Sequence, residues 1–131
     1  MPNFAFRKNK FSTGQRLIVD LIIDKVNQFE SFKDRLEKNQ LKKLNVISSS
    51  ILQISENRTL PQNKHRKLHS KFDIYEFKSG DLRLYYTKTK GGTIISLGGY
   101  KNNQTKDIKK MESICEKLIT FFKTNKLNCD E

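Results

Sequence analysis

The sequence FDIYEFK at residues 72–78 is followed by LRLYYTK at 82–88 and by TIISLGG at 93–99. Apolar side chains alternate with polar ones in the first two segments, and β-branched residues are frequent in the third, which is typical of β-strands. Gly80 lies between the first two segments and can supply the positive φ angle of a tight hairpin turn. These segments predict a small, twisted antiparallel sheet.

Residues 15–57 precede this sheet and have the apolar spacing of helices. Apolar side chains recur three or four positions apart, beginning with Ile18 and Leu21. We expect a helical hairpin here, whose second part is one kinked helix or two shorter helices. Ser12 or Thr13 is the expected N-cap of its first helix.

The two ends of the chain complete the predicted fold. Residues 1–14 are either a first strand around Phe4 or a basic arm, and residues 106–123 form a last helix capped by Thr105 or Asp107. The expected class is α+β, with an N-terminal helical hairpin, the sheet and a C-terminal helix in one domain over residues 1–131. The sheet and last helix occupy residues 64–122. The buried stripe of the last helix is Ile108, Met111, Cys115, Leu118, Ile119 and Phe122.

The overall composition narrows the possible partners and location. The net charge of +12 favours nucleic acid or an acidic protein as partner, while 35% hydrophobic residues suffice for a core. No segment has the pattern of a signal peptide or the roughly 20 apolar residues of a membrane span. Cys115 and Cys129 form no disulfide framework, so we expect reduced thiols, with Cys129 in a frayed tail, and a cytoplasmic location.

Residues 57–70 form a polar, basic segment that predicts a loop before the sheet. His65 and His69 lie in it, and histidine can act as acid or base near neutral pH. Arg66 and the neighbouring lysines would lower the pKa of these imidazoles and favour the neutral form. Solvated loop histidines are the alternative. A zinc site is not expected, because acidic or cysteine ligands are missing nearby.

Arg83 is the strongest single candidate for contact with phosphate. In LRLYY, Arg83 and Tyr85 share the face opposite the leucines. A guanidinium can hold two phosphate oxygens at once. The alternative is a surface arginine paired with Asp73 or Asp81.

Residues 72–86 carry a family resemblance. FDIYEFK followed by GDLRLYY resembles the leucine-tyrosine-glutamate-leucine-arginine and glycine-x-tyrosine-arginine pattern of RelE/ParE-superfamily toxins. LGGYKNNQT at 97–105 is similar to the leucine-histidine-glycine-phenylalanine-lysine pattern of the HigB-like, phage-derived branch. Gly98 stands where many of those sequences have histidine, and the lysine run is diluted after Lys101. The resemblance implies a RelE-like fold.

The resemblance also implies a function, the toxin of a toxin–antitoxin pair. Such a toxin is a metal-independent endoribonuclease without cofactor that cleaves mRNA, commonly on the ribosome, and it binds a cognate antitoxin that is acidic or contains a helix-turn-helix. In the reaction a ribose 2′-OH attacks the adjacent phosphate, which needs a base, cations and an acid. The catalytic candidates are Arg83, His69, Lys71, His65, Tyr100 and Lys101.

The remaining basic and aromatic residues near the sheet suit an RNA footprint. They are Lys64, Arg66, Lys67, Lys78, Tyr85, Lys88, Lys90 and Lys106. Two other functions remain open at this point. The chain is alternatively a ParE-like inhibitor of DNA gyrase or an RNA-binding module without catalysis.

Overall fold

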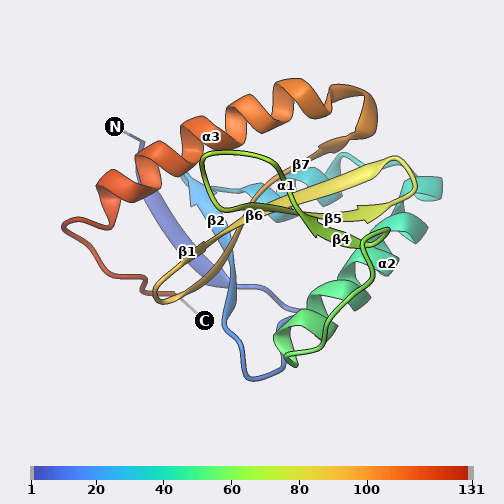
Figure 1. Ribbon diagram of the computed structural model, residues 1–131, viewed down its shortest axis with the longest axis horizontal. Helices are drawn as coiled ribbons and strands as arrows, with labels where there is room; N and C mark the ends of the chain where they lie inside the picture. Colours follow the sequence, from blue (N-terminus) through green and yellow to red (C-terminus); the bar gives the residue numbers. More distant parts are fainter. Residues whose placement is uncertain (1, 130–131) are drawn as a thin grey trace.

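The computed structural model describes residues 2–129 and has an α+β fold (Figure 1). Within this range a mixed seven-stranded sheet has the order β1-β2-β7-β6-β5-β4, and the short β3 pairs with β2. Helix α3 packs on one face of the sheet, and α1 and α2 pack on the other. The strands are β1 (Phe4–Lys8), β2 (Ile18–Ile23), β3 (Val26–Asn27), β4 (His65–Lys67), β5 (Ile74–Ser79), β6 (Leu82–Thr89) and β7 (Gly92–Tyr100). The helices are α1 (Gln28–Asp34), α2 (Lys38–Ser55) and α3 (Gln104–Phe121), with the 3-10 turn η1 (Lys101–Asn103) before α3.

The three strands predicted at residues 72–78, 82–88 and 93–99 are confirmed as β5, β6 and β7. Gly80 has a φ of 57° in the β5–β6 turn, as the hairpin requires. The leucines of β6 face the core under α1 and α2, whereas Tyr85 lies on the opposite face under α3. The C-terminal helix is also confirmed as α3, and its apolar stripe packs onto the sheet through Met111, Cys115 and Leu118.

The predicted helical region of residues 15–57 is wrong in its first part, because residues 18–23 form strand β2. This strand is parallel to β7 and antiparallel to β1. Ile18 packs against α1 and α2, whereas Val19 and Leu21 pack under α3. A strand buried on both faces carries a nearly continuous apolar run, and such a run also satisfies helical spacing.

Because residues 18–23 form a strand, both the sheet and the N-terminal segment differ from the prediction. The sheet is mixed rather than antiparallel, since β2 and β7 run in the same direction. Of the two possibilities for residues 1–14, the structure has the strand, β1, at the sheet edge. The expected helical hairpin is reduced to the short α1 and the longer α2, separated at residues 35–37.

The predicted helix caps are wrong. The Ser12 hydroxyl accepts a hydrogen bond from the backbone of Ile18 and donates one to the carbonyl of Arg16, which holds the β1–β2 connection. Asn27 is the residue that caps α1, through the backbone N–H of Glu30. Helix α3 begins one position before Thr105, after the N-cap residue Asn103.

Three further expectations near the C-terminus and the basic segment need correction. Residues 65–67 of the predicted loop pair with β5 as the edge strand β4. Ile119 is 54% exposed instead of buried. Cys129 packs against the cluster around Phe6 rather than lying in a frayed tail, and both cysteines are free thiols. Among residues 2–129, none of the helices has both the length and the apolar character needed to cross a membrane.

Gly98 lies against the ring of Phe32. A Cβ atom at Gly98 would lie 2.3 Å from Cγ of Phe32, which α1 buries against this part of β7. Any side chain here would therefore have to displace the Phe32 ring.

We expect Gly98→Ala to lower the free energy of unfolding by about 1–3 kcal/mol, the usual cost of overpacking a core. Urea denaturation followed by circular dichroism measures the change. Gly91→Ala is the matched control, because its Cβ would lie 3.2 Å from the Cβ of Leu127, in a partly buried side chain that can shift. Equal stability of the two variants would contradict this account of Gly98.

Candidate nucleic-acid interface at strand β4

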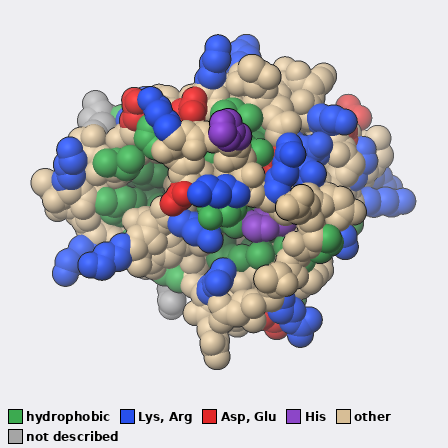
Figure 2. Space-filling view, in the orientation of Figure 1, with side chains coloured by type: hydrophobic (Ala, Val, Ile, Leu, Met, Phe, Trp, Pro, Cys, Tyr) green, Lys and Arg blue, Asp and Glu red, His purple; other side chains and the backbone are tan. Residues whose placement is uncertain are grey.

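Strand β4 divides the basic segment between the two faces of the sheet. Its register pairs His65 with Phe77, Arg66 with Glu76, and Lys67 with Tyr75. Because successive side chains of a strand point to opposite faces, His65 and Lys67 lie on the α2 side and Arg66 lies on the α3 side. Figure 2 shows both histidines on one side of the molecule, with Lys and Arg side chains around them.

On the α2 side, three rings form a parallel array that we call the aromatic site, together with Lys67 and Lys88. The His65 and Tyr75 rings have centroids 5.9 Å apart and an interplanar angle of 4°, and Tyr75 and Tyr86 are 5.0 Å apart at 7°. Nε2 of His65 and Oη of Tyr86 are 2.6 Å apart. This hydrogen bond fixes the orientation of the imidazole.

The electrostatics of the aromatic site favour a neutral imidazole. Burial lowers the pKa of His65, and the positive charge of Lys88 lowers it further, while Glu76 opposes the change. Burial raises the pKa of Tyr86, so its phenol stays protonated. Lys88 Nζ lies 4.4 Å from the centroid of the Tyr75 ring. Lys67 Nζ lies 6.0 Å from the same ring and 3.0 Å from Asp73 Oδ1.

On the α3 side, a buried carboxylate organises a second group of residues, which we call the ionic cluster (Arg66, Glu76, Arg83 and Gln104). Glu76 is completely buried. Nε of Arg66 donates to Glu76 Oε2, and Nε2 of Gln104 donates to Glu76 Oε1. Arg83 Nε lies 3.7 Å from Glu76 Oε1. The ionic cluster thus ties β4 and the first residue of α3 to the middle of the sheet.

Arg83 has an internal position in this cluster. Its side chain is 8% exposed, and Nη1 donates to the carbonyls of Gly80 and Leu82 at 2.8 Å each. These hydrogen bonds hold the β5–β6 hairpin. Arg66, whose side chain is 47% exposed, is the member of the cluster with a guanidinium open to solvent.

Tyr85, on the sheet under α3, and Asp107, in the first turn of α3, lie beside the ionic cluster. Tyr85 is completely buried, so it has no exposed ring face on which a base could stack. Burial raises the pKa of both the Tyr85 phenol and the Asp107 carboxyl. Oη of Tyr85 and Oδ2 of Asp107 are buried without a hydrogen-bond partner in the described part of the chain.

The other catalytic candidates do not gather with Arg83 or His65. His69 and Lys71 are exposed in the loop between β4 and β5, where Lys71 Nζ lies 5.3 Å from the Phe72 ring. Tyr100 packs edge-on against Phe32 on the α1 side, with ring centroids 6.2 Å apart. Lys101 is exposed in η1.

The remaining basic candidates of the RNA footprint are spread over several elements. Lys64 precedes β4, and Lys78 is the half-buried, second-last residue of β5. Lys90 lies in the β6–β7 turn, and Lys106 lies in the first turn of α3. Of the lysines in the predicted footprint, Lys67 and Lys88 are the two that belong to the aromatic site.

The sequence analysis missed four residues that the structure places at these two sites: Tyr75, Tyr86, Glu76 and Gln104. Tyr75 and Tyr86 are direct cross-strand partners. This pairing could have been predicted from the turn at Gly80, because the position of a hairpin turn sets the register of its two strands and so decides which residues lie opposite each other. Gln104 has no comparable local signal.

Comparison with known proteins adds no relative: no protein family, curated protein or solved structure matches the chain. Within residues 2–129, no group of three or more His, Cys, Asp or Glu side chains lies close enough together to hold a metal ion.

We expect Arg83→Ala to lower the free energy of unfolding by about 3 kcal/mol, because it removes a buried partner of the buried Glu76. Arg66→Ala is the comparison, since its half-exposed guanidinium can be replaced by water at a smaller cost. Thermal and urea denaturation measure both. If Arg83→Ala is as stable as the parent chain, Arg83 is not the structural residue that these contacts indicate.

Proposed function

We propose that this protein is an RNA-cleaving toxin, a metal-independent endoribonuclease that acts on mRNA in the cytoplasm. The single observation that carries the proposal is the imidazole of His65, which is hydrogen-bonded to Tyr86 and stacked beside the Tyr75 ring, where Lys67 and Lys88 also lie. Burial and the charge of Lys88 lower its pKa and so favour the neutral form. An acid–base group beside stacking rings and cations is the set of groups that RNA cleavage needs. The toxin class and action on the ribosome are supported by the resemblance of residues 72–105 to HigB-like sequences.

In the proposed reaction, His65 accepts the proton of a ribose 2′-OH through Nδ1, while Nε2 stays bonded to Tyr86. The 2′ oxygen forms a bond to the adjacent phosphorus, and the bond from phosphorus to the 5′ oxygen breaks. The leaving 5′ oxygen takes a proton from an ammonium group at the site. The products have a 2′,3′-cyclic phosphate and a 5′-hydroxyl end. Lys67 and Lys88 stabilise the negative charge that develops on phosphate.

Tyr75 has the proposed role of holding the substrate. It is half-buried, and its ring lies parallel to those of His65 and Tyr86. An unpaired base can stack on such a ring, and each stacked base contributes about 1–3 kcal/mol to the binding of single strands. The surrounding lysines and Arg66 bind the backbone, so affinity falls steeply with salt.

The ionic cluster has a positioning role in this proposal. Arg66 is anchored to Glu76 on one face of β4, and His65 projects from the same three-residue strand on the other face. A strand this short depends on such anchors for a fixed geometry, and a displaced catalytic group loses much of its effect.

A second candidate function is RNA binding without cleavage. It is favoured by the internal position of Arg83, whose Nη1 is bonded to backbone carbonyls instead of facing a substrate. In that case Tyr75 and the lysines form the whole of the functional surface.

We expect His65→Ala to reduce RNA cleavage by about 10²–10⁴, the usual contribution of a general base. His69→Ala is the matched control, because His69 is exposed on the loop, and it should keep nearly the parental rate. The measurement is cleavage of mRNA with and without ribosomes, with the ends of the products identified and EDTA present. Parental cleavage by His65→Ala would refute the assignment of His65. RNA that is bound but never cleaved would favour the second candidate.

The pH dependence tests the same imidazole separately. The cleavage rate should be constant above the ordinary histidine pKa of about 6.5 and fall only at lower pH, since burial and Lys88 lower the pKa of His65. Lys88→Ala removes a positive charge that lowers the pKa of His65. The pH below which the cleavage rate falls, the acid limb of the profile, should therefore move to a higher value. Lys90→Ala, at the exposed β6–β7 turn, should leave it in place. An acid limb that is the same in both variants would show that the titrating group is not beside Lys88.

The same pKa shift affects stability. The unfolded chain binds a proton on His65 at a higher pH than the folded chain does. The contribution of the neutral imidazole to the free energy of unfolding is therefore fully present above the pKa of the unfolded chain. It is lost as the pH falls through the lower pKa of the folded chain. His65→Ala should remove this part of the acid destabilisation.

A further inference from the structure

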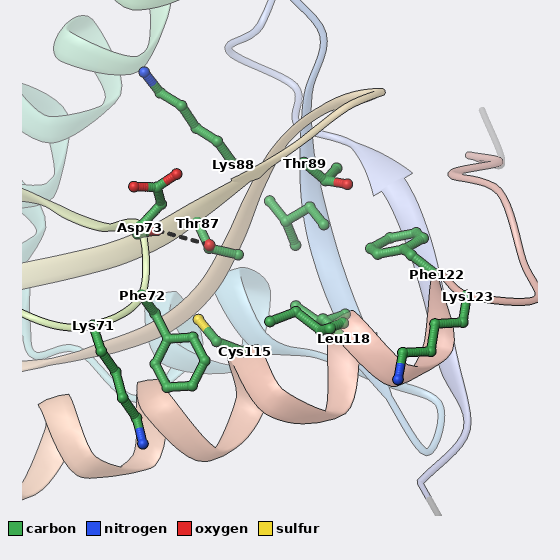
Figure 3. A pocket seen from close by; sticks show the side chains of 12 residues that line it. Lys71, Phe72, Asp73, Thr87, Lys88, Thr89, Cys115, Leu118, Phe122 and Lys123 are labelled. Atoms are coloured by element: carbon green, nitrogen blue, oxygen red, sulfur yellow. Dashed lines mark hydrogen bonds between the residues drawn. The ribbon is translucent and has the colours of Figure 1, made fainter.

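A cavity of about 460 Å³ lies on the α3 face of the sheet, between the loop before β5, the end of β6 and the C-terminal half of α3 (Figure 3). Its apolar lining comes from residues far apart in the sequence. These are Phe72, Ile94, Cys115, Leu118 and Phe122. The hydroxyl groups of Thr87 and Thr89 lie at its upper side in Figure 3.

The margin of this cavity is positively charged. The exposed lysines Lys71 and Lys123 stand at two of its sides, whereas the side chain of Lys88 points away from the cavity (Figure 3) and lies over the Tyr75 ring. Asp73 is the one carboxylate among the residues that line the cavity, and it is already paired with Lys67 at 3.0 Å. An apolar floor is thus flanked by two ammonium groups.

The apolar surface continues beyond the cavity along α3. Ile119 lines the cavity and is 54% exposed, the largest exposure among the large hydrophobic residues of the described chain. A small ligand enclosed in the cavity would leave Ile119 in water. A peptide that places one side chain in the cavity and continues across α3 would cover it.

We propose that this cavity and Ile119 form a docking site for an acidic segment of a partner protein. An aromatic or branched apolar side chain of the segment fills the cavity, and carboxylates before and after it meet Lys71 and Lys123. Affinity rests mainly on the buried anchor, because anchors in desolvated pockets dominate such interfaces. The lysines chiefly select an acidic partner and speed its association. This site is on the α3 face and does not require the proposed RNA cleavage.

The site can be tested with a fluorescein-labelled synthetic peptide of about twelve residues, rich in Glu and Asp with one central Trp. Fluorescence anisotropy with the full chain at physiological salt gives the affinity. Replacing the Trp of the peptide with Ala should weaken binding by about tenfold or more, and exchanging its acids for lysine should abolish binding.

Two variants of the protein locate the peptide. Ile119→Glu should weaken binding by about tenfold or more. Val46→Glu is the matched control, because Val46 is a 40% exposed apolar residue on α2, and it should bind as the parent chain does. Both positions are exposed enough for the fold to tolerate the change, which circular dichroism verifies.

Backbone amide NMR spectra decide between specific docking and general charge attraction. Docking predicts that the signals of Cys115, Leu118 and Phe122 shift with the peptide and do not shift with single-stranded RNA. Equal affinity of the Trp and Ala peptides, equal effects of the two variants, or shifts at these residues with RNA alone would overturn the proposal. RNA cleavage by the Ile119→Glu variant should be unchanged, so this outcome is independent of the assignment of His65.

Discussion

Glu76 is completely buried between β4, β6 and the start of α3, so its negative charge needs partners from all three elements. An unpaired carboxylate in this position would cost several kcal/mol. Arg66, Arg83 and Gln104 meet that need, and Arg83 also bonds to the carbonyls of the β5–β6 turn. One buried charge therefore connects the edge strand, the central hairpin and the last helix. Strand β4, which has only three residues, depends on it most.

The fixed position of β4 gives the two faces of the sheet different chemistry. His65 enters an array of parallel rings on the α2 side, and Arg66 reaches the buried carboxylate on the α3 side. Under the proposed function, one face therefore performs the acid–base step while the other holds the strand in place. The cavity beside α3 lies on the face away from the stacked rings.

The parts of the fold that could be predicted are those with local signals. Period-two alternation and the glycine turn identified β5 and β6, and the apolar stripe identified α3. Residues 18–23 were misassigned because a strand covered on both faces has no polar side, and Asp20 in its middle is buried between Asn9 and Asn27. Of the candidate site, His65, Lys67 and Lys88 were foreseen. The ring array was not, since it arises from pairing between β4, β5 and β6.

The sequence by itself determined the α+β class, the central hairpin strands, the last helix and the strongly basic surface, because each follows from spacing or composition within a short segment. Only the tertiary structure decided that Ile18–Ile23 lies parallel to β7, that β4 divides the histidine and arginine of a basic segment between two faces, and that Arg83 points inward. The physical reason is the same in each case. Residues distant in the sequence exclude water from these side chains. That burial decides whether an arginine makes internal contacts or faces solvent, and whether an imidazole is neutral.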